Sequence, residues 1–332
     1  MELSEDELVA AIRKVLSGES PGVIVGPGDD AAVVEAGAGS QVLTTDMLVE
    51  GVHFDRRLVS ARDLGAKSIV VNVSDIAAMA ASPRYALVSL GIPSDVEAAW
   101  VIELYGGMRA ACAEYALSLV GGDTNRADCV VISVTVVGEV APGRTVTRAG
   151  ALSGDLIVVT GSLGAAAGGL ALSRAHPTKV SRAIGTPWGH ELLDALARPL
   201  ARVGEGQTLA QAGATAMIDL SDGLAKDLSR LCVESGVGAR VKLGRVPVCP
   251  SLRPAAELLG LDALELAISG GEDYELLATL DLTHFERARE ELDERFGVTL
   301  TDIGMIVDEG LVAVDERGRE SVLEPKGWDH FA

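Results

Sequence analysis

Carboxylates recur along this sequence in short motifs that glycine, serine or threonine residues flank. Six such motifs occur: Gly28-Asp29-Asp30, Thr44-Thr45-Asp46, Asn72-Val73-Ser74-Asp75, Gly121-Gly122-Asp123, Asp219-Leu220-Ser221-Asp222-Gly223 and Gly270-Gly271-Glu272-Asp273. Oxygen ligands without histidine or cysteine partners favour Mg²⁺ or Mn²⁺ over Zn²⁺. Such cations beside glycine turns are typical of phosphate chemistry, in which they bridge phosphate oxygens and neutralise developing charge. The motifs therefore predict a phosphate site with several Mg²⁺ ions.

Taken singly, each motif also has an ordinary structural explanation. Asp75 lies in the nearly apolar stretch 68–80, where burial is costly unless the carboxylate is paired, hydrogen-bonded or bound to a metal. Asp29 and Asp30 follow a Gly-Pro-Gly turn, and adjacent carboxylates repel each other unless a cation lies between them. Polar turns and helix caps contain the same residue types. It is the recurrence of the motifs on one acidic chain that favours a metal site.

The composition of the chain narrows the classes of function. The 332 residues are 48% apolar and 23% charged, which is enough for a full core, and their formal net charge is -20. Such a chain repels nucleic-acid backbones and anionic lipids, and it would repel a nucleotide unless cations intervene. The same charge also aids solubility. We expect no nucleic-acid or membrane partner, and we expect Mg²⁺ to contact bound phosphates.

Cysteine spacing and hydropathy indicate a reduced, cytoplasmic protein. Cys112, Cys129, Cys232 and Cys249 form no CxxC pair and show no zinc spacing, so we expect reduced thiols. Residues 1–20 are charged and amphipathic, unlike a signal peptide. Every long apolar run is interrupted before the roughly 20 residues that a membrane helix needs.

Hydrophobic periodicity predicts two α/β domains. Helices are expected at 4–17, 61–81 and 94–117, and strands at 31–34, 41–45, 86–92, 130–140 and 155–160. Ser94 is the expected N-cap of the third helix, Asp46 is expected at the end of a strand, and Gly121-Gly122-Asp123 in a turn. Glycine and proline mark 141–154 as the best domain boundary. We expect an N-terminal domain at 1–141 and a C-terminal domain at 151–332, each with a sheet covered by helices.

Familiar nucleotide-binding motifs are missing from the sequence. It contains no P-loop and no protein-kinase signature. The segment 161–164 follows a strand as a dinucleotide loop does, but its glycine spacing is wrong and helix packing is the better interpretation. Arg148 suits a phosphate contact or a salt bridge. His53 alone would be read as structural, whereas Tyr105 and Trp328 suit either core packing or stacking on a flat ligand.

The motif set resembles that of the thiamine-monophosphate kinases, which belong to the superfamily of aminoimidazole ribonucleotide synthetase. The matching segments, in the family's order, are GPGDDAAVV (26–34), TTDMLVEGVHF (44–54), AKSIVVNVSDIAAMAASP (66–83), GGDTNR (121–126), TRAG (147–150), DLSDGL (219–224), SGGEDYELL (269–277) and KGWDHF (326–331). GDD, SD and GGD alone would indicate only the superfamily. GVHF, GGEDYEL and the terminal GWDHF are specific to the kinase.

The resemblance implies an enzyme, a phosphotransferase that uses ATP to phosphorylate thiamine monophosphate on its existing phosphate. The products would be thiamine diphosphate and ADP, in the last step of thiamine diphosphate biosynthesis. It also implies two α/β domains of the aminoimidazole ribonucleotide synthetase-like type. The N-terminal sheet would pair with that of a second subunit in a homodimer, and ATP would lie in the cleft of the dimer.

Position by position, the resemblance implies three groups of ligands. The expected Mg²⁺ ligands are Asp30, Thr44, Thr45, Asp46, Asp75, Asp123, Asp219 and Asp222. The expected nucleotide contacts are Tyr105, Gly122, Asp123, Arg148 and Ser221. The expected substrate contacts are His53, Glu272 and Trp328. Among adjacent carboxylates, Asp30 is favoured over Asp29, and Glu272 over Asp273.

The chemistry of the implied substrate agrees with these roles. Thiamine monophosphate carries a cationic thiazolium, so stacking on Trp328 would contribute about 0.5–2 kcal/mol. Glu272 can accept from the aminopyrimidine or attract the cation, and His53 can reach the substrate phosphate. The attacking phosphate oxygen is ionised near neutral pH, so we expect direct in-line transfer with no general base and no phosphoenzyme.

Two alternatives were weighed against the kinase. Among relatives, selenophosphate synthetase needs a reactive residue near the N-terminus, whereas the first cysteine is Cys112. The hydrogenase-maturation carbamoyl dehydratase needs a C-terminal cysteine, but this chain ends in Ala332. Aminoimidazole ribonucleotide synthetase would not explain GWDHF. A non-catalytic nucleotide sensor would have had no reason to keep a ligand at every metal position.

Overall fold

The computed structural model describes residues 11–16, 21–25, 33–34 and 36–328. The Gly28-Asp29-Asp30 motif and most of the helix expected at 4–17 lie outside these residues. The chain divides into two compact units. One contains residues 1–76 and 81–143, and the other contains residues 77–80 and 144–332. We call them the first and the second unit. The change from one to the other at Gly143 falls inside the segment 141–154.

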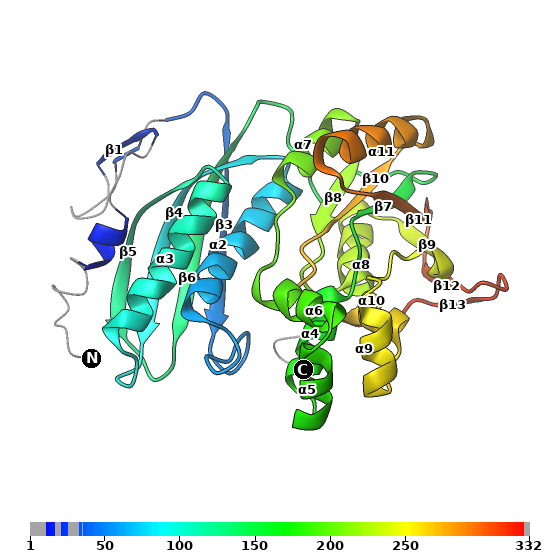
Figure 1. Cartoon of the computed structure of the whole chain (residues 1–332). Coiled ribbons are helices and arrows are strands. Elements are labelled where there is room, and N and C mark those ends of the chain that lie inside the picture. The colour runs from blue at the N-terminus through cyan, green and yellow to red at the C-terminus, as the bar shows by residue number, and fades with distance from the viewer. Residues whose placement is uncertain (1–10, 17–20, 26–32, 35, 329–332) are drawn as a thin grey trace. The chain divides into compact units, whose positions relative to one another are not determined.

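The first unit is a four-stranded sheet with two helices on one face (Figure 1). Its strands are β3 (Ser40–Val49), β4 (Ser82–Ile92), β5 (Ser118–Arg126) and β6 (Val131–Val140), in the order β3-β6-β4-β5. Strands β4 and β5 pair in parallel, and the other pairs are antiparallel. The helices are α2 (Ala61–Ala78) and α3 (Ala98–Glu114). A separate two-stranded sheet joins β1 (Val23–Val25) to β2 (Val33–Val34).

Alternation of side chains explains why this sheet has one covered face. In β6 every second residue is buried, including Ile132, Val134 and Val136.

Glycine lets the two covering helices approach each other closely. A Cβ on Gly65 of α2 would lie 1.9 Å from the carbonyl oxygen of Leu104 in α3, so no larger residue fits there. This contact fixes α2, and with it Asp75, against α3.

The second unit has a larger sheet, with strand order β13-β12-β9-β11-β7-β10-β8. The strands are β7 (Leu156–Thr160), β8 (Ala216–Asp219), β9 (Gly238–Lys242), β10 (Leu276–Leu280), β11 (Leu300–Val307), β12 (Leu311–Val314) and β13 (Glu320–Val322). The helices are α4 (Ala165–Ser173), α5 (Pro177–Ile184), α6 (Pro187–Ala197), α7 (Val203–Gln211), α8 (Leu224–Ser235), α9 (Leu252–Leu259), α10 (Ala263–Ser269) and α11 (Leu282–Phe296), with a short 3₁₀ turn η1 (Leu243–Arg245). Among these strands, β12 and β9 pair in parallel and the other pairs are antiparallel.

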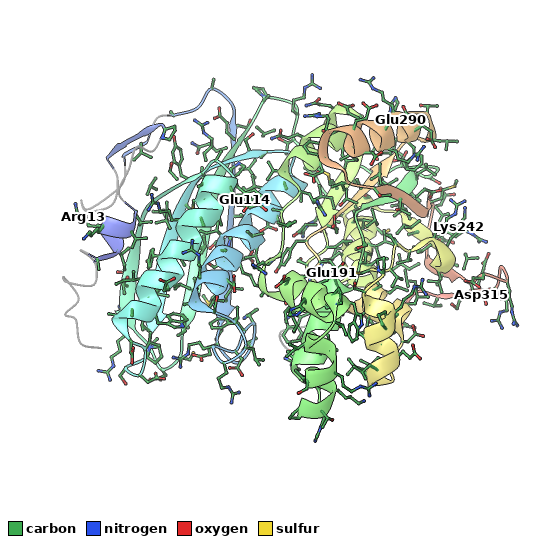
Figure 2. All side chains as sticks on the ribbon, viewed as in Figure 1. Arg13, Glu114, Glu191, Lys242, Glu290 and Asp315 are labelled. Atoms are coloured by element: carbon green, nitrogen blue, oxygen red, sulfur yellow. The ribbon has the colours of Figure 1, made fainter. Side chains whose placement is uncertain are left out.

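Both faces of this sheet are covered, which the fully buried strand β7 shows directly. Its Ile157 and Val159 belong to a core cluster that includes side chains of α4, α6 and α8, whereas Leu156 and Val158 belong to a cluster with α7 and α11. Uninterrupted apolar runs are typical of strands buried on both faces. Charged side chains such as Glu290 on α11 remain on the outside of the unit (Figure 2).

Most of the predicted elements are confirmed, and three local predictions are wrong. Helix α3 begins at Ala98 with Glu97 as its N-cap, so Ser94 does not cap it. Asp46 lies inside β3, which continues to Val49. Gly121-Gly122-Asp123 is not a turn, because β5 runs through it in register with β4. The four cysteines are free thiols, as expected. In the described part of the chain, no helix is long and apolar enough to span a membrane.

Candidate functional site

Strand β3 and helix α2 bring together residues that lie about thirty positions apart in the sequence. The hydroxyl of Thr44 donates a hydrogen bond to Oδ2 of Asp75 at 2.5 Å. The backbone N–H of Asp46 donates to Oδ1 of Asn72, one turn earlier on α2, at 2.9 Å. Asp75 is half-buried, as the sequence predicts, and it lies within the helix rather than at a cap. Thr44, Asp46 and Asp75 thus form one oxygen-rich patch of the first unit.

The side chain of Thr45 is separated from this patch. Because successive residues of a strand point to opposite faces, Thr45 faces away from the helices while Thr44 and Asp46 face them. Its hydroxyl donates to the backbone oxygen of Val134 at 3.1 Å and accepts from Thr135. The structure therefore does not bring the Thr45 hydroxyl beside Asp75.

Strand β5 and helix α3 carry the second group of expected ligands in the first unit. Asp123 is exposed on β5. Tyr105 of α3 is only 3% exposed, so its ring packs in the core and offers no open face for stacking. Burial raises the pKa of Tyr105 to about 12, although a hydrogen bond with Thr124 opposes this shift. The polar end of Tyr105 is thus directed toward β5 beside Asp123.

Gly122 is required by the sheet itself. A Cβ at this position would lie 2.0 Å from the carbonyl oxygen of Val88 in the neighbouring strand β4. We predict that Gly122→Ala destabilises the protein by about 1–3 kcal/mol, because the strands must separate to admit the methyl group. Thermal unfolding would measure the loss. Gly121→Ala is the matched control, since its Cβ would meet only the flexible end of Leu87, at 3.2 Å. Equal stability of the two variants would contradict this explanation.

His53 lies in the turn that follows β3. The ring Nδ1 of His53 accepts a hydrogen bond from the backbone N–H of Val49 at 3.0 Å. The backbone N–H of His53 donates to the backbone oxygen of Val49 at 2.9 Å. Accepting at Nδ1 places the proton of the neutral ring on Nε2. The ring is thereby fixed to the end of β3, with Nε2 as its donor atom.

In the second unit, the two acidic loops of the sequence lie against each other. Asp219 ends β8 and is 2% exposed, and it pairs in register with Leu276 of β10. Beyond the strands, the N–H of Glu272 donates to the oxygen of Ser221 at 2.8 Å. A Cβ on Gly271 would lie 2.4 Å from that same oxygen, so the close approach depends on glycine. The segments 219–223 and 270–275 therefore form one continuous surface.

Asp222 is held by residues of α8 that the sequence analysis missed. Arg230 donates to Oδ2 of Asp222 at 2.6 Å and to Oδ1 of Asp227 at 2.7 Å, and Lys226 lies 3.4 Å from Asp222. Oδ2 of Asp227 accepts from the N–H groups of Asp222 and Gly223, both at 3.0 Å. Burial raises the pKa of Asp227 to about 6. Asp227 is fully buried although it lies on a helix with other charged residues, and the sequence alone gives no sign of this burial.

The C-terminal motif reaches the same loop. The N–H of Trp328 donates to the oxygen of Asp222 at 3.0 Å, and Gly327 packs on Lys226. The side chain of Trp328 is 38% exposed. The segments that contain Ser221, Asp222, Glu272 and Trp328 are thus gathered at one place in the second unit.

Arg148 is carried by a segment that lies along β8. The N–H of Met217 donates to the oxygen of Thr147 at 2.9 Å. The hydroxyl of Ser235, the last residue of α8, donates to the oxygen of Arg148 at 2.9 Å and accepts from the N–H groups of Gly150 and Ala151 at 3.1 and 3.2 Å. The guanidinium of Arg148 is exposed.

Comparison with known proteins finds similarity along nearly the whole chain. The model of the AIR synthase related protein N-terminal domain matches residues 28–140, and that of the C-terminal domain matches residues 153–316. The thiamine-monophosphate kinase of Aquifex aeolicus is 37% identical over 330 residues, which cover 99% of each chain. The chain belongs to the thiamine-monophosphate kinase family.

Solved structures of thiamine-monophosphate kinases share the fold. The crystal structure of the enzyme from Stenotrophomonas maltophilia K279a has a TM-score of 0.80 and 35% identity, covering 94% of this chain and 97% of the other. The structure of AaThiL complexed with AMPPCP and TMP has a TM-score of 0.76 and 35% identity, covering 99% and 98%. The fold class predicted from the sequence is therefore confirmed.

The oxygen-rich patch of the first unit has the donor atoms that Mg²⁺ prefers. Thr44, Asp46 and Asp75 present only oxygen atoms, and two of these oxygens already lie 2.5 Å apart. This donor set fits a hard divalent cation. Within the described ranges, no group of three or more histidine, cysteine, aspartate or glutamate side chains is placed to hold a metal. Asp30, the expected ligand nearest the N-terminus, lies outside those ranges.

Proposed function

We propose that this chain transfers the terminal phosphate of ATP to the phosphate of thiamine monophosphate, forming thiamine diphosphate and ADP. The observation that carries the proposal is the complex of AaThiL with AMPPCP, an ATP analogue, and TMP, because the similarity to that protein covers 99% of this chain. The convergence of the DLSDG, GGEDYEL and GW segments in the second unit supports it.

Each unit carries residues that we propose as Mg²⁺ ligands. In the first unit they are Thr44, Asp46, Asp75 and Asp123, with Asp30 from the sequence, and in the second unit they are Asp219 and Asp222. When bound, the cations would supply positive charge that offsets the negative charge developing on the phosphates during transfer. The packing of α2 against α3 fixes the position of Asp75. The carboxylate of Asp227 holds the backbone of Asp222 by accepting its N–H. We keep Thr45 as a proposed ligand only through its backbone atoms, because its hydroxyl faces away from Thr44 and Asp75.

The thiamine end of the substrate is assigned to His53, Glu272 and Trp328. The exposed part of the Trp328 ring suits a cationic thiazolium, and Glu272 adds a carboxylate on the adjoining loop. His53 donates from Nε2, the atom that suits a phosphate oxygen. The attacking oxygen is an ionised phosphate, so positioning and charge neutralisation suffice without a general base.

The nucleotide is assigned to Tyr105, Gly122, Asp123, Arg148 and Ser221. Arg148 is the exposed cation among them and suits a phosphate. The burial of Tyr105 changes its expected role from stacking to a contact through its hydroxyl, next to Asp123.

We further propose that the open face of the first unit's sheet binds a second copy of the chain. Leu43, Met47 and Leu87 are 66%, 54% and 43% exposed, and all three are on sheet strands. Large apolar side chains exposed on strands of one sheet indicate an interface. Light scattering should give twice the mass of one chain, and a monomer would contradict this proposal.

The reaction itself is tested by mixing the purified protein with ATP, Mg²⁺ and thiamine monophosphate. Thiamine diphosphate and ADP should appear in equal amounts, and chelation of Mg²⁺ should stop both. Formation of ADP only with a different phosphate acceptor would show that the substrate is misassigned. A radiolabelled phosphate that remains covalently on the protein during turnover would contradict direct transfer.

A further inference from the structure

The loop 270–275 has an unusual backbone. Among the described residues, four non-glycine residues have a positive φ, and two of them are Glu272 at 67° and Tyr274 at 51°. Side chains with a Cβ avoid this region, so such residues persist only where surrounding contacts hold them. The proposed thiamine contact Glu272 is therefore in a conformation that the rest of the loop must maintain.

Hydrogen bonds to segment 219–223 hold the main chain on one side of the loop. Glu272 and Tyr274 donate their N–H groups to the oxygens of Ser221 and Leu220 at 2.8 and 2.9 Å. These bonds fix the distance between the two loops. These two backbone bonds hold only the side of the loop 270–275 that faces segment 219–223, so the opposite side needs another anchor.

Asp273 provides that second anchor, on helix α4. Both of its carboxylate oxygens accept from the N–H of Gly164, at 2.8 and 3.0 Å, and the N–H groups of Ala165 and Ala166 also bond to it. Gly164 is the N-cap of α4 and has no side chain with which to cap its own helix. A carboxylate from a distant loop therefore caps α4 and stabilises its N-terminus.

Helix α4 is a rigid anchor because it is packed through glycine. A Cβ on Gly169 would lie 2.2 Å from the oxygen of Leu192 in α6, and a Cβ on Gly168 would lie 2.8 Å from Leu252 of α9. Gly168 and Gly169 therefore serve helix packing. The helix cannot move without disturbing its neighbours, so the position of Asp273 is fixed as well.

We propose that Asp273 is a positioning residue, which orients Glu272 toward the thiamine part of the substrate by tying the loop 270–275 to helix α4. This rests on the proposed function. Asp273 lies next to Glu272 in the chain, and its capping bonds and the two backbone bonds to segment 219–223 hold opposite sides of one strained loop. Its role concerns the binding of thiamine monophosphate and leaves the binding of ATP unchanged.

Steady-state kinetics of Asp273→Ala tests the role. We expect the KM for thiamine monophosphate to rise at least tenfold while the KM for ATP changes less than twofold. Asp273→Asn keeps one acceptor oxygen and should give an intermediate KM, which supplies the same comparison if the alanine variant does not fold. The matched control is Asp281→Ala, because Asp281 caps α11 by accepting from Thr283 at 2.8 Å. It should lower thermal stability and leave both KM values unchanged.

A double-mutant comparison separates positioning from a merely structural effect. In a Glu272→Gln background, Asp273→Asn should change the KM for thiamine monophosphate less than twofold, because the carboxylate that Asp273 orients has already been removed. An unchanged KM in the single Asp273 variants, or an equal rise in both backgrounds, would overturn the inference. Failure of the unmodified protein to form thiamine diphosphate would instead contradict the proposed function.

Discussion

Asp75→Asn is expected to lower the turnover number for thiamine diphosphate formation by about 100- to 1,000-fold. The asparagine has the same shape and can still accept the hydrogen bond from Thr44, which Asp75 accepts at 2.5 Å, but it has no negative charge. A charge contact to the transferring phosphate through a cation contributes several kcal/mol, and each 1.4 kcal/mol is about tenfold in rate. Rates should be measured at saturating ATP, Mg²⁺ and thiamine monophosphate.

The control for this variant lies on the same helix. Asp63→Asn changes a partly exposed aspartate in the first turn of α2 that is bonded to Ser60, and its turnover should match that of the unmodified protein. Circular dichroism and thermal unfolding should be close to unmodified in both variants. Wild-type turnover of Asp75→Asn would remove Asp75 from the proposed metal site.

Arg202→Met is expected to destabilise the second unit by about 3–5 kcal/mol, the usual result of leaving a buried charge without its partner. Arg202 donates two hydrogen bonds to Glu275, at 2.8 and 2.6 Å, and one to Glu205 at 3.2 Å. The two glutamates are 6% and 7% exposed. Thr160 also donates to Glu275, at 2.6 Å, so this cluster joins β7, α7 and the end of the loop 270–275.

The loss of stability should depend on pH. Burial raises the pKa of Glu275, and Arg202 opposes that shift. Removing Arg202 raises the pKa of Glu275 in the folded protein further above the pKa of the same group in the unfolded chain. A raised carboxyl pKa adds stability at low pH that is lost as the pH rises through the folded value, so Arg202→Met should be less destabilised at pH 5 than at pH 8.

Chemical unfolding at the two pH values measures this prediction, with Arg198→Met as its control. Arg198 pairs with Asp194 at the surface, where both side chains are more than half exposed. An exposed pair contributes about 0–1 kcal/mol, so its loss should be small at either pH. Equal losses in the two variants would show that the Arg202 cluster is not a buried ion pair in solution.

The positions of candidate ligands could be predicted from the sequence better than their contacts. Asp75 could be recognised because a carboxylate in an apolar helix is costly, and the structure finds it half-buried. Nothing in the sequence shows that the hydroxyl of Thr44 reaches it. The separation of Thr45 from Thr44 was available from the two-residue period of a strand, which the resemblance to known kinases obscured.

Elements set by pairing with distant segments were harder to predict. Two glycines before Asp123 favour a turn on local grounds, yet the oxygen of Val88 needs the space at Gly122, so the glycine belongs to a strand. Asp227 and Arg230 were missed because a helix with charged residues on one side is usually solvated. Their importance comes from the folded loop 219–223, which no local pattern describes.

Helix α8 acts as a spacer of fixed length between two functional segments. Its first turn holds the loop of Ser221 and Asp222, and its last residue, Ser235, holds the segment of Arg148. Twelve residues at 1.5 Å each set these ends about 18 Å apart. One inserted residue would turn the far end by about 100° and break one of the two attachments. Insertions and deletions among related chains should therefore avoid α8 and collect in turns such as 315–319, between β12 and β13.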